Sequence, residues 1–382
     1  MTLLVLSTHK GPLCFFRPRC KGTKNLPTKL PLPKNQYAKQ TDPTYPPSRR
    51  TATVFPMQTL PMIARALAVL TLATIGCRST SQPTEPVEPP PTPETLRSLA
   101  LFDGHSGAEA SWQELGERID DADVVVIGEL HGHPVGLPFA ALLFEESLDR
   151  NPDAALALEF VNRDRQYMLD AYLQDVVDWD GLVAAMKGSK GNNVLPHKPM
   201  IEAAKRAGRP VYAANAPRFY TRIARKKGYE ALKELSAEQQ RLFDIPDPMP
   251  SGGYRERFFD IMRSPKPDPE QDAEASEAPE EEKEPEPPTE RMKSVFRSQS
   301  LWDGTMSATT AKAVRAGQRP VFLEIGQFHC DKDGGTMQLL RKHLPGANIL
   351  VVSVADTWSE SLREEDQDRA DFIVYVGPGK EH

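Results

Sequence analysis

Short apolar runs alternate with amphipathic stretches along residues 98–378. The apolar runs consist mostly of Val, Ile, Leu and Ala without polar alternation, which is typical of strands buried on both faces. They predict strands at 123–128, 154–160, 210–214, 320–325, 348–354 and 372–376. The stretches between them predict helices at 135–150, 163–176, 198–207, 254–263, 291–316 and 335–344. Because strands and helices alternate, we expect a single α/β domain with a mostly parallel sheet flanked by helices.

Two of the predicted strands end in similar motifs. Gly-Glu-Leu-His at 128–131 follows Val-Val-Val-Ile, and Gly-Gln-Phe-His at 326–329 follows Val-Phe-Leu-Glu-Ile. In open α/β sheets, functional groups gather at the carboxyl ends of the strands. The motifs therefore predict one site with His131 and His329 at its edges, although about 200 residues separate them.

The first motif combines a carboxylate and an imidazole. Glu129 and His131 are two residues apart, so an extended backbone would direct both side chains the same way. The pair could share a metal ion, or act as a base and the group that orients it. A solvated Glu and His in a loop remain the alternative, and the second motif makes that alternative less favourable.

The sequence before residue 98 differs from the rest. Residues 1–56 hold ten Lys/Arg against one Asp, a net charge of +9, and form no periodic apolar pattern. We regard 1–61 as a doubtful extension, either a disordered basic arm or the product of a misassigned start codon, and we favour the latter. Residues 62–77 have the layout of a secretory signal: a short basic start, an apolar core and Gly76-Cys77.

Cys77 resembles the lipidated cysteine of a bacterial lipobox, and a lipid there would anchor the protein to a membrane without spanning it. The alternative is a plain signal peptide, or a buried helix with an incidental cysteine. Residues 78–97 are rich in Pro, Ser, Thr and Glu and predict a stalk. Together these features predict a lipid-anchored protein of the cell envelope, on its periplasmic or surface side.

Charge patterning marks one insertion and excludes one class of partner. Residues 265–290 carry eleven Asp/Glu and two Lys, a net charge of −9, with seven prolines. This composition predicts a disordered loop within the domain, either a tolerated surface insertion or a tail that binds cations or a partner. The whole chain has a net charge of −6, and its basic surplus lies in the doubtful extension, so no nucleic-acid binding is expected.

Five segments, in order along residues 123–345, resemble one family. They are Val-Ile-Gly-Glu129-Leu-His131; Ala-Leu-Ala-Leu-Glu159-Phe160; Gly-Arg-Pro-Val-Tyr212-Ala-Ala-Asn215-Ala-Pro-Arg218; Gln299-Ser-Leu-Trp302-Asp303-Gly-Thr-Met306-Ser-Ala; and Gly-Gln-Phe-His329 with the following Gly334-Gly335. On these motifs the chain resembles the ChaN-like haem-binding uptake proteins of the Tiki superfamily.

The resemblance implies a haem-binding lipoprotein that takes part in haem or iron uptake. Since haem iron is held by His or Tyr, it implies His131 first and His329 second as groups near the iron, with Tyr212 and Tyr254 as lesser candidates. Arg218 and Arg163 could pair with the haem propionates, because guanidinium binds carboxylate bidentately. Trp302 and Met306, four residues apart on a predicted helix, are expected in the core.

Two other functions stay open. In a metal-dependent hydrolase, resembling proteases or esterases of the wider superfamily, Glu129, His131, Glu159 and His329 could hold a divalent metal, with Glu129, His131 and His329 as the catalytic groups. No Gly-x-Ser-x-Gly motif supplies a serine nucleophile. In an interaction lipoprotein, the motif residues would only hold loops in place. Whether the protein forms a homodimer around a ligand is also open.

Overall fold

The computed structural model describes residues 90–187, 191–264 and 286–379 of the chain. The predicted extension at 1–61, the signal segment with Cys77, residues 78–89 of the stalk and residues 265–285 of the acidic insertion lie outside the described residues. The described end of the stalk includes the short helix α1 (Pro93–Arg97), and Glu290 is the first residue of a long helix.

The centre of the fold is a seven-stranded sheet in the order β1-β7-β6-β2-β5-β3-β4. Neighbouring strands are parallel except β1, which pairs antiparallel with β7 at one edge. The strands are β1 (Ala100–Asp103), β2 (Val124–Glu129), β3 (Ala155–Asn162), β4 (Val211–Asn215), β5 (Val321–Gly326), β6 (Ile349–Ala355) and β7 (Phe372–Tyr375). The expected α/β fold with a mostly parallel sheet is confirmed.

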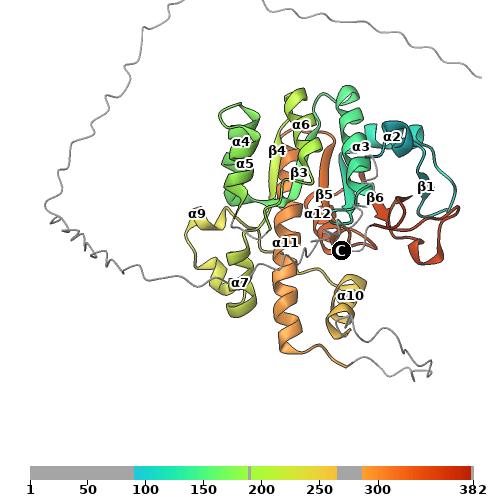
Figure 1. Ribbon diagram of the computed structural model, residues 1–382. Coiled ribbons are helices and arrows are strands. Elements are labelled where there is room, and N and C mark those ends of the chain that lie inside the picture. The colour runs from blue at the N-terminus through green and yellow to red at the C-terminus, as the bar shows by residue number, and fades with distance from the viewer. Residues whose placement is uncertain (1–89, 188–190, 265–285, 380–382) are drawn as a thin grey trace, which may run out of the picture. The chain divides into compact units, whose positions relative to one another are not determined.

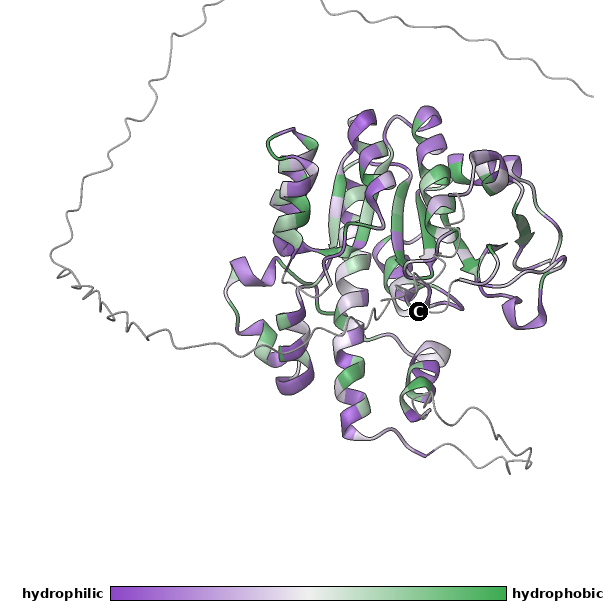
Figure 2. Ribbon diagram, viewed as in Figure 1, coloured by the Kyte–Doolittle hydropathy of each residue, from purple (hydrophilic) through white to green (hydrophobic). Residues whose placement is uncertain are grey.

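Helices cover both faces of the sheet (Figure 1). On one face, α3 (Gly136–Arg150), α4 (Gln166–Leu173) and α6 (Lys198–Ala207) share a hydrophobic core with alternate residues of the strands. On the other face, α11 (Glu290–Arg315) and α12 (Gly335–His343) pack their apolar side chains against the remaining strand residues. Figure 2 shows the sheet as the most hydrophobic layer, as expected for strands buried on both faces.

The helix α11 has 26 residues and extends past the ends of the strands (Figure 1). Its C-terminal half, which includes Met306, packs against the sheet. Its N-terminal half packs against α10 (Gly252–Arg263) through Phe296, Tyr254 and Phe258, and against α7 (Arg218–Lys227). Residues 299–303 of this helix therefore lie close to the carboxyl ends of the strands.

The prediction missed the short elements. The edge strand β1 has four residues and no long apolar run. The missed helices are α1, α2 (Trp112–Asp120), α5 (Trp179–Met186), α7, α8 (Glu230–Lys233) and α9 (Ala237–Gln240), and there are short 3-10 turns at Arg163–Arg165 (η1), Gln327–His329 (η2) and Glu364–Asp366 (η3). Within the described ranges, no helix combines the length and the apolar character needed to cross a membrane.

Candidate functional site

A cavity of about 400 Å³ lies at the carboxyl ends of β2, β3, β4 and β5. Its volume falls within the range of small-molecule sites, roughly 300–1,000 Å³. Its lining residues come from strand ends and from the loops that follow them: Glu129, His131, Gly132, Glu159, Phe160, Asn162, Gly191, Asn193, Pro196, His197, Asn215, Arg218, Trp302 and His329. The fold thus brings the two histidine motifs to one cavity.

Glu129 connects two histidines at the end of β2. Its Oε1 is 3.0 Å from Nδ1 of His131, and its Oε2 is 2.6 Å from Nε2 of His197. Glu129 and His197 are buried, whereas the side chain of His131 is 66% exposed. Since Nδ1 of His131 faces the carboxylate, its other ring nitrogen is left for a ligand in the cavity.

This network changes the protonation of its members. Burial raises the pKa of Glu129, but the hydrogen bonds from His131 and His197 outweigh burial and hold that pKa below its usual value. The hydrogen bond to Glu129 raises the pKa of His131 above its ordinary value, against a smaller opposing effect of burial. Glu129 is therefore an ionised carboxylate that orients His131.

A glycine makes room for the imidazole of His131. Gly326, the last residue of β5, lies opposite Glu129 in the parallel register of β2 and β5. A Cβ atom at this position would meet Cε1 of His131 at 2.9 Å. The glycine of the second histidine motif thus serves the histidine of the first.

His329 has a different environment. Its side chain is 8% exposed, and its Nδ1 lies 2.6 Å from Oδ1 of Asp303, which is fully buried on α11. Its Nε2 lies 3.7 Å from Oε1 of Glu159. Burial lowers the pKa of His329, but the charges of Asp303 and Glu159 outweigh burial and raise it to about 9. His329 is therefore a buried imidazolium between two carboxylates at neutral pH.

Asp303 is itself held by two further hydrogen bonds. Thr336 donates its hydroxyl to Oδ1 at 2.9 Å, and Tyr254 donates its hydroxyl to Oδ2 at 2.7 Å. Both donors are buried. The aspartate that accompanies His329 is thus fixed by α10 and α12 as well as by its own helix.

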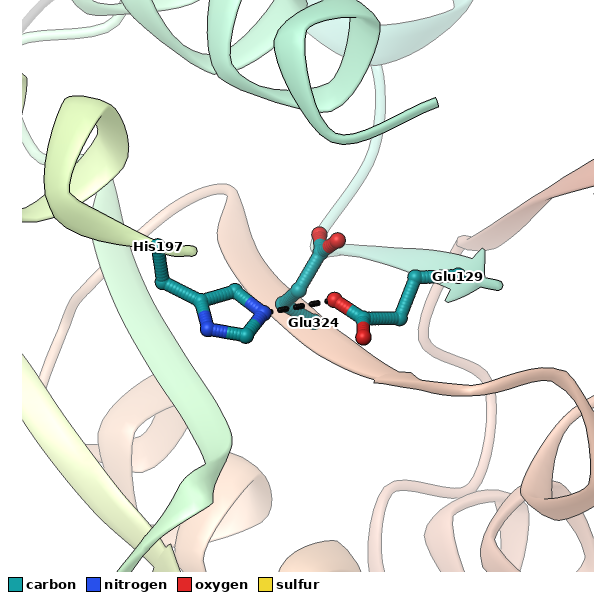
Figure 3. A group of neighbouring side chains, drawn as sticks. All are labelled: Glu129, His197 and Glu324. Carbon is teal, nitrogen blue, oxygen red and sulfur yellow. Dashed lines mark hydrogen bonds and ion pairs between the residues drawn. The ribbon is translucent and has the colours of Figure 1, made fainter. Parts of the chain in front are cut away.

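Glu324 lies on β5 beside Glu129 and His197, and it does not itself line the cavity. It is fully buried, and neither carboxylate oxygen has a hydrogen-bond partner among the described residues. Burial and the neighbouring charge of Glu129 raise its pKa well above the usual value for a carboxyl group. Figure 3 shows Glu324 beside Glu129 and His197, and one ligand atom from each of the three lies within 4.8 Å of the others.

The lining of the cavity also offers an apolar surface and a cation. The guanidinium of Arg218 lies over the ring of Trp302, 5.7 Å from the centroid. Phe160 stacks on His197 and meets the ring of His131 edge-on. The amide nitrogen of Asn162 is buried and has no hydrogen-bond partner in the described part of the chain. These aromatic rings and donors can hold a flat apolar ligand that carries an acidic group.

The structure places the residues predicted from sequence in three groups. Glu129, His131, Glu159, His329 and Arg218 all line the cavity. Tyr212 lines a separate cavity that also contains Arg163, and Tyr254 is buried against Asp303. Cys77 lies outside the described residues.

Arg163, Trp302 and Met306 lie in three different environments. Arg163 forms an ion pair with Asp244 at 2.6 Å and is not part of the site. Trp302 lines the cavity rather than lying wholly in the core, whereas Met306 is fully buried in the core.

Sequence reasoning missed His197 and Glu324. His197 precedes α6 and follows no strand, so the rule that assigns function to strand ends did not include it. Glu324 did carry a signal, because it is the only charged residue in the apolar run of β5. An ionisable side chain in a strand buried on both faces needs a partner, and this should have marked it.

The fold and site define a class: an α/β protein with a carboxylate–imidazole cavity at the carboxyl ends of its parallel strands. Residues 115–340 match the family described as "Haem-binding uptake, Tiki superfamily, ChaN". The match spans more than half of the chain, so the chain belongs to this family. The curated proteins contain no significant match.

A comparison with solved structures supports the fold. The chain is similar to ChaN of Campylobacter jejuni, whose structure is described as cofacial haem binding, with a TM-score of 0.50 and 16% identity over 72% of this chain and 96% of that one. It is less similar to the type III effector HopBA1 (TM-score 0.40, 14% identity, 74% and 98% covered) and to the erythromycin esterase EreC (TM-score 0.36, 12% identity, 73% and 83% covered). At these identities the likeness to ChaN shows a common fold.

Proposed function

We propose that this protein binds haem in the cavity at the strand ends and acts in haem or iron uptake. The observation that carries the proposal is His131, an exposed imidazole in that cavity whose Nδ1 is engaged by a buried carboxylate. Membership of a haem-binding uptake family supports it. We assign His131 as the iron ligand.

The residues present suit that assignment. An imidazole that donates Nδ1–H to a carboxylate keeps the lone pair of Nε2 for a metal and becomes a more basic ligand. Bound haem supplies an iron atom that accepts such a nitrogen. Glu129 provides the carboxylate, and Gly326 leaves the space in which the ring stands.

Other residues that line the cavity suit the porphyrin ring and the propionates of haem. Trp302 and Phe160 offer aromatic surfaces to a flat apolar ring system. Arg218, which lines the cavity beside Trp302, and the unpartnered amide nitrogen of Asn162 offer donors to a propionate. His329 is buried and already paired, so we assign it a structural role beside the ligand.

A haemin titration of the purified chain, followed by absorbance, tests the proposal. We expect a saturable shift of the Soret band that weakens at least tenfold in affinity in His131→Ala. The matched control is His105→Ala. His105 is similarly exposed and is paired with a carboxylate, that of Asp368, but it does not line the cavity. Sedimentation of the loaded protein checks whether haem binding is accompanied by dimerisation.

The tyrosines provide the competing outcome. Tyr212→Phe and Tyr254→Phe should leave the Soret shift unchanged, because neither side chain lines the cavity. Loss of the shift in either variant would transfer the iron ligand to that tyrosine. No saturable shift in the unaltered chain would overturn haem binding and direct the next assay to metal content and hydrolysis.

We further propose that the protein is anchored to a cell-envelope membrane through a lipid on Cys77. The support is the signal-like sequence at 62–77 and the stalk composition that follows it. Growth with a radiolabelled fatty acid should label the chain, and Cys77→Ser should abolish the label. Cys330→Ser is the control, because Cys330 is buried. Unlabelled chain in the membrane fraction would contradict the anchor.

A further inference from the structure

The buried side of the cavity contains a second set of ligand atoms that haem binding does not use. Glu129 and Glu324 lie on the adjacent parallel strands β2 and β5, and His197 is the residue that immediately precedes α6. One carboxylate oxygen or ring nitrogen from each residue lies within 4.8 Å of the others, and all three residues are buried (Figure 3). We propose that these three residues bind one divalent transition-metal cation, for which Zn²⁺ is a suitable probe.

The unpartnered carboxyl group of Glu324 is the first support. It is fully buried, and neither of its oxygens receives a hydrogen bond from a donor among the described residues; its polar neighbour is the carboxyl group of Glu129. Burying a polar group without a partner is destabilising, and more so when the group is charged. Glu324 also lies next to Glu129, a second carboxylate. A cation between them would satisfy both groups.

The orientation of His197 is the second support. Its Nδ1 lies 3.3 Å from the carbonyl oxygen of Asn193, and a carbonyl can only accept, so Nδ1 donates. In the neutral ring Nε2 then carries no proton, so its contact of 2.6 Å with Oε2 of Glu129 needs a cation between the two atoms, either the proton of the hydrogen bond described above or a metal ion. A backbone carbonyl that fixes the tautomer in this way is the usual outer partner of a metal-bound histidine.

The donor set indicates the kind of cation. One imidazole and two carboxylates suit Zn²⁺, Fe²⁺ or Mn²⁺, whereas Ca²⁺ and Mg²⁺ prefer oxygen ligands alone. Three protein ligands leave a fourth position open toward the cavity. Only Oε2 of Glu129 is needed, so its Oε1 keeps the hydrogen bond to His131.

The alternative occupant is a proton. A hydrogen ion on Glu324 would relieve the repulsion from Glu129, and a hydrogen bond from Nε2 of His197 would account for the short contact to Oε2 of Glu129. The two occupants make opposite predictions for Glu324→Gln, which keeps the shape of the side chain and removes its ability to ionise. A metal site loses a ligand, whereas a protonated acid is replaced by a neutral group of the same size.

Calorimetric titration of the chelator-treated full chain with Zn²⁺ tests the proposal. We expect saturable binding of one Zn²⁺ per chain, and a higher melting temperature when Zn²⁺ is present. Glu324→Gln and His197→Gln should each weaken binding at least tenfold. Glu159→Gln is the matched control, since Glu159 lines the same cavity but is not one of the three ligands, and it should bind Zn²⁺ like the unaltered chain.

Two results would overturn the metal site. One is the absence of stoichiometric binding by the unaltered chain, which would leave a proton as the occupant. The other is unchanged affinity in Glu324→Gln together with a loss in Glu159→Gln, which would place the cation on different residues. Zn²⁺ binding is measured without haemin, so failure of the haem proposal and failure of this one are separate results.

Discussion

The two Gly-x-x-His motifs look alike in sequence but become opposite sites. His131 presents an exposed imidazole to the cavity, whereas His329 is buried as an imidazolium. Each has a buried carboxylate on Nδ1: Glu129 for the first and Asp303 for the second. A shared motif therefore places a histidine just after the end of a strand, and its tertiary neighbours decide whether the ring is exposed to the cavity or buried.

The difference follows from what covers each strand end. After β2 the chain turns at Gly132, where φ is +73°, and the side chain of His131 stays 66% exposed. After β5 the chain enters the 3-10 turn η2 beneath α11, whose Asp303 receives His329. The long helix α11 therefore covers His329, whereas it leaves His131 exposed.

The largest effect should come from breaking the buried pair. Asp303→Asn leaves the His329 imidazolium without its closest counter-charge, and we expect a loss of about 3–5 kcal/mol in the free energy of unfolding. Chemical denaturation measures it. Thr336→Val, which removes one hydrogen bond to Asp303, should cost only about 1 kcal/mol. Equal losses in the two variants would contradict a charged pair.

The pH dependence of stability should reveal the same imidazolium. His329 has a folded pKa of about 9, above its unfolded value of roughly 6.5, so its stabilising contribution is complete below pH 6.5 and is lost as pH rises through 9. The shift corresponds to a contribution on the order of 3 kcal/mol. Unfolding curves between pH 6 and pH 10 should flatten in His329→Gln relative to the unaltered chain. Parallel curves would show that His329 does not titrate in this range.

The exposed histidine should give the reverse pattern. His131→Ala removes an exposed side chain but takes one hydrogen bond from the buried carboxylate of Glu129, so the free energy of unfolding should fall by about 1–2 kcal/mol, less than in Asp303→Asn. Haemin affinity should fall at least tenfold in the same variant, equivalent to about 1.4 kcal/mol. Denaturation and haemin titration of one preparation measure both. A large loss of stability would remove the distinction between the two histidines.

The smallest effect should come from the glycine that serves His131. In Gly326→Ala the new Cβ would approach Cε1 of His131 and turn the ring, so haemin affinity should fall a few-fold. Backbone strain is not expected, because φ of Gly326 is −62°. Titration of this variant beside His131→Ala checks the order of the effects. Unchanged affinity would mean that the orientation of the ring does not matter.

Much of the fold followed from local pattern. The strands from β2 to β7 were predicted within one or two residues of their observed bounds, because short runs of β-branched residues such as Val-Val-Val-Ile favour strands buried on both faces of a sheet. The edge strand β1 escaped because its four residues owe their conformation to pairing with β7. The site was found only in part, because His197 reaches Glu129 from 68 residues away.

The sequence by itself determined the class of fold, the carboxylates and histidines at the strand ends, and the resemblance to a haem-binding family. These depend on hydrophobic periodicity and on short motifs, which are local properties of the chain. The tertiary structure alone decided that His131 is exposed and His329 buried, that Tyr212 and Tyr254 lie away from the cavity, and that Glu324 meets Glu129 and His197. Burial and charge pairing arise between elements distant in sequence, so no local pattern encodes them.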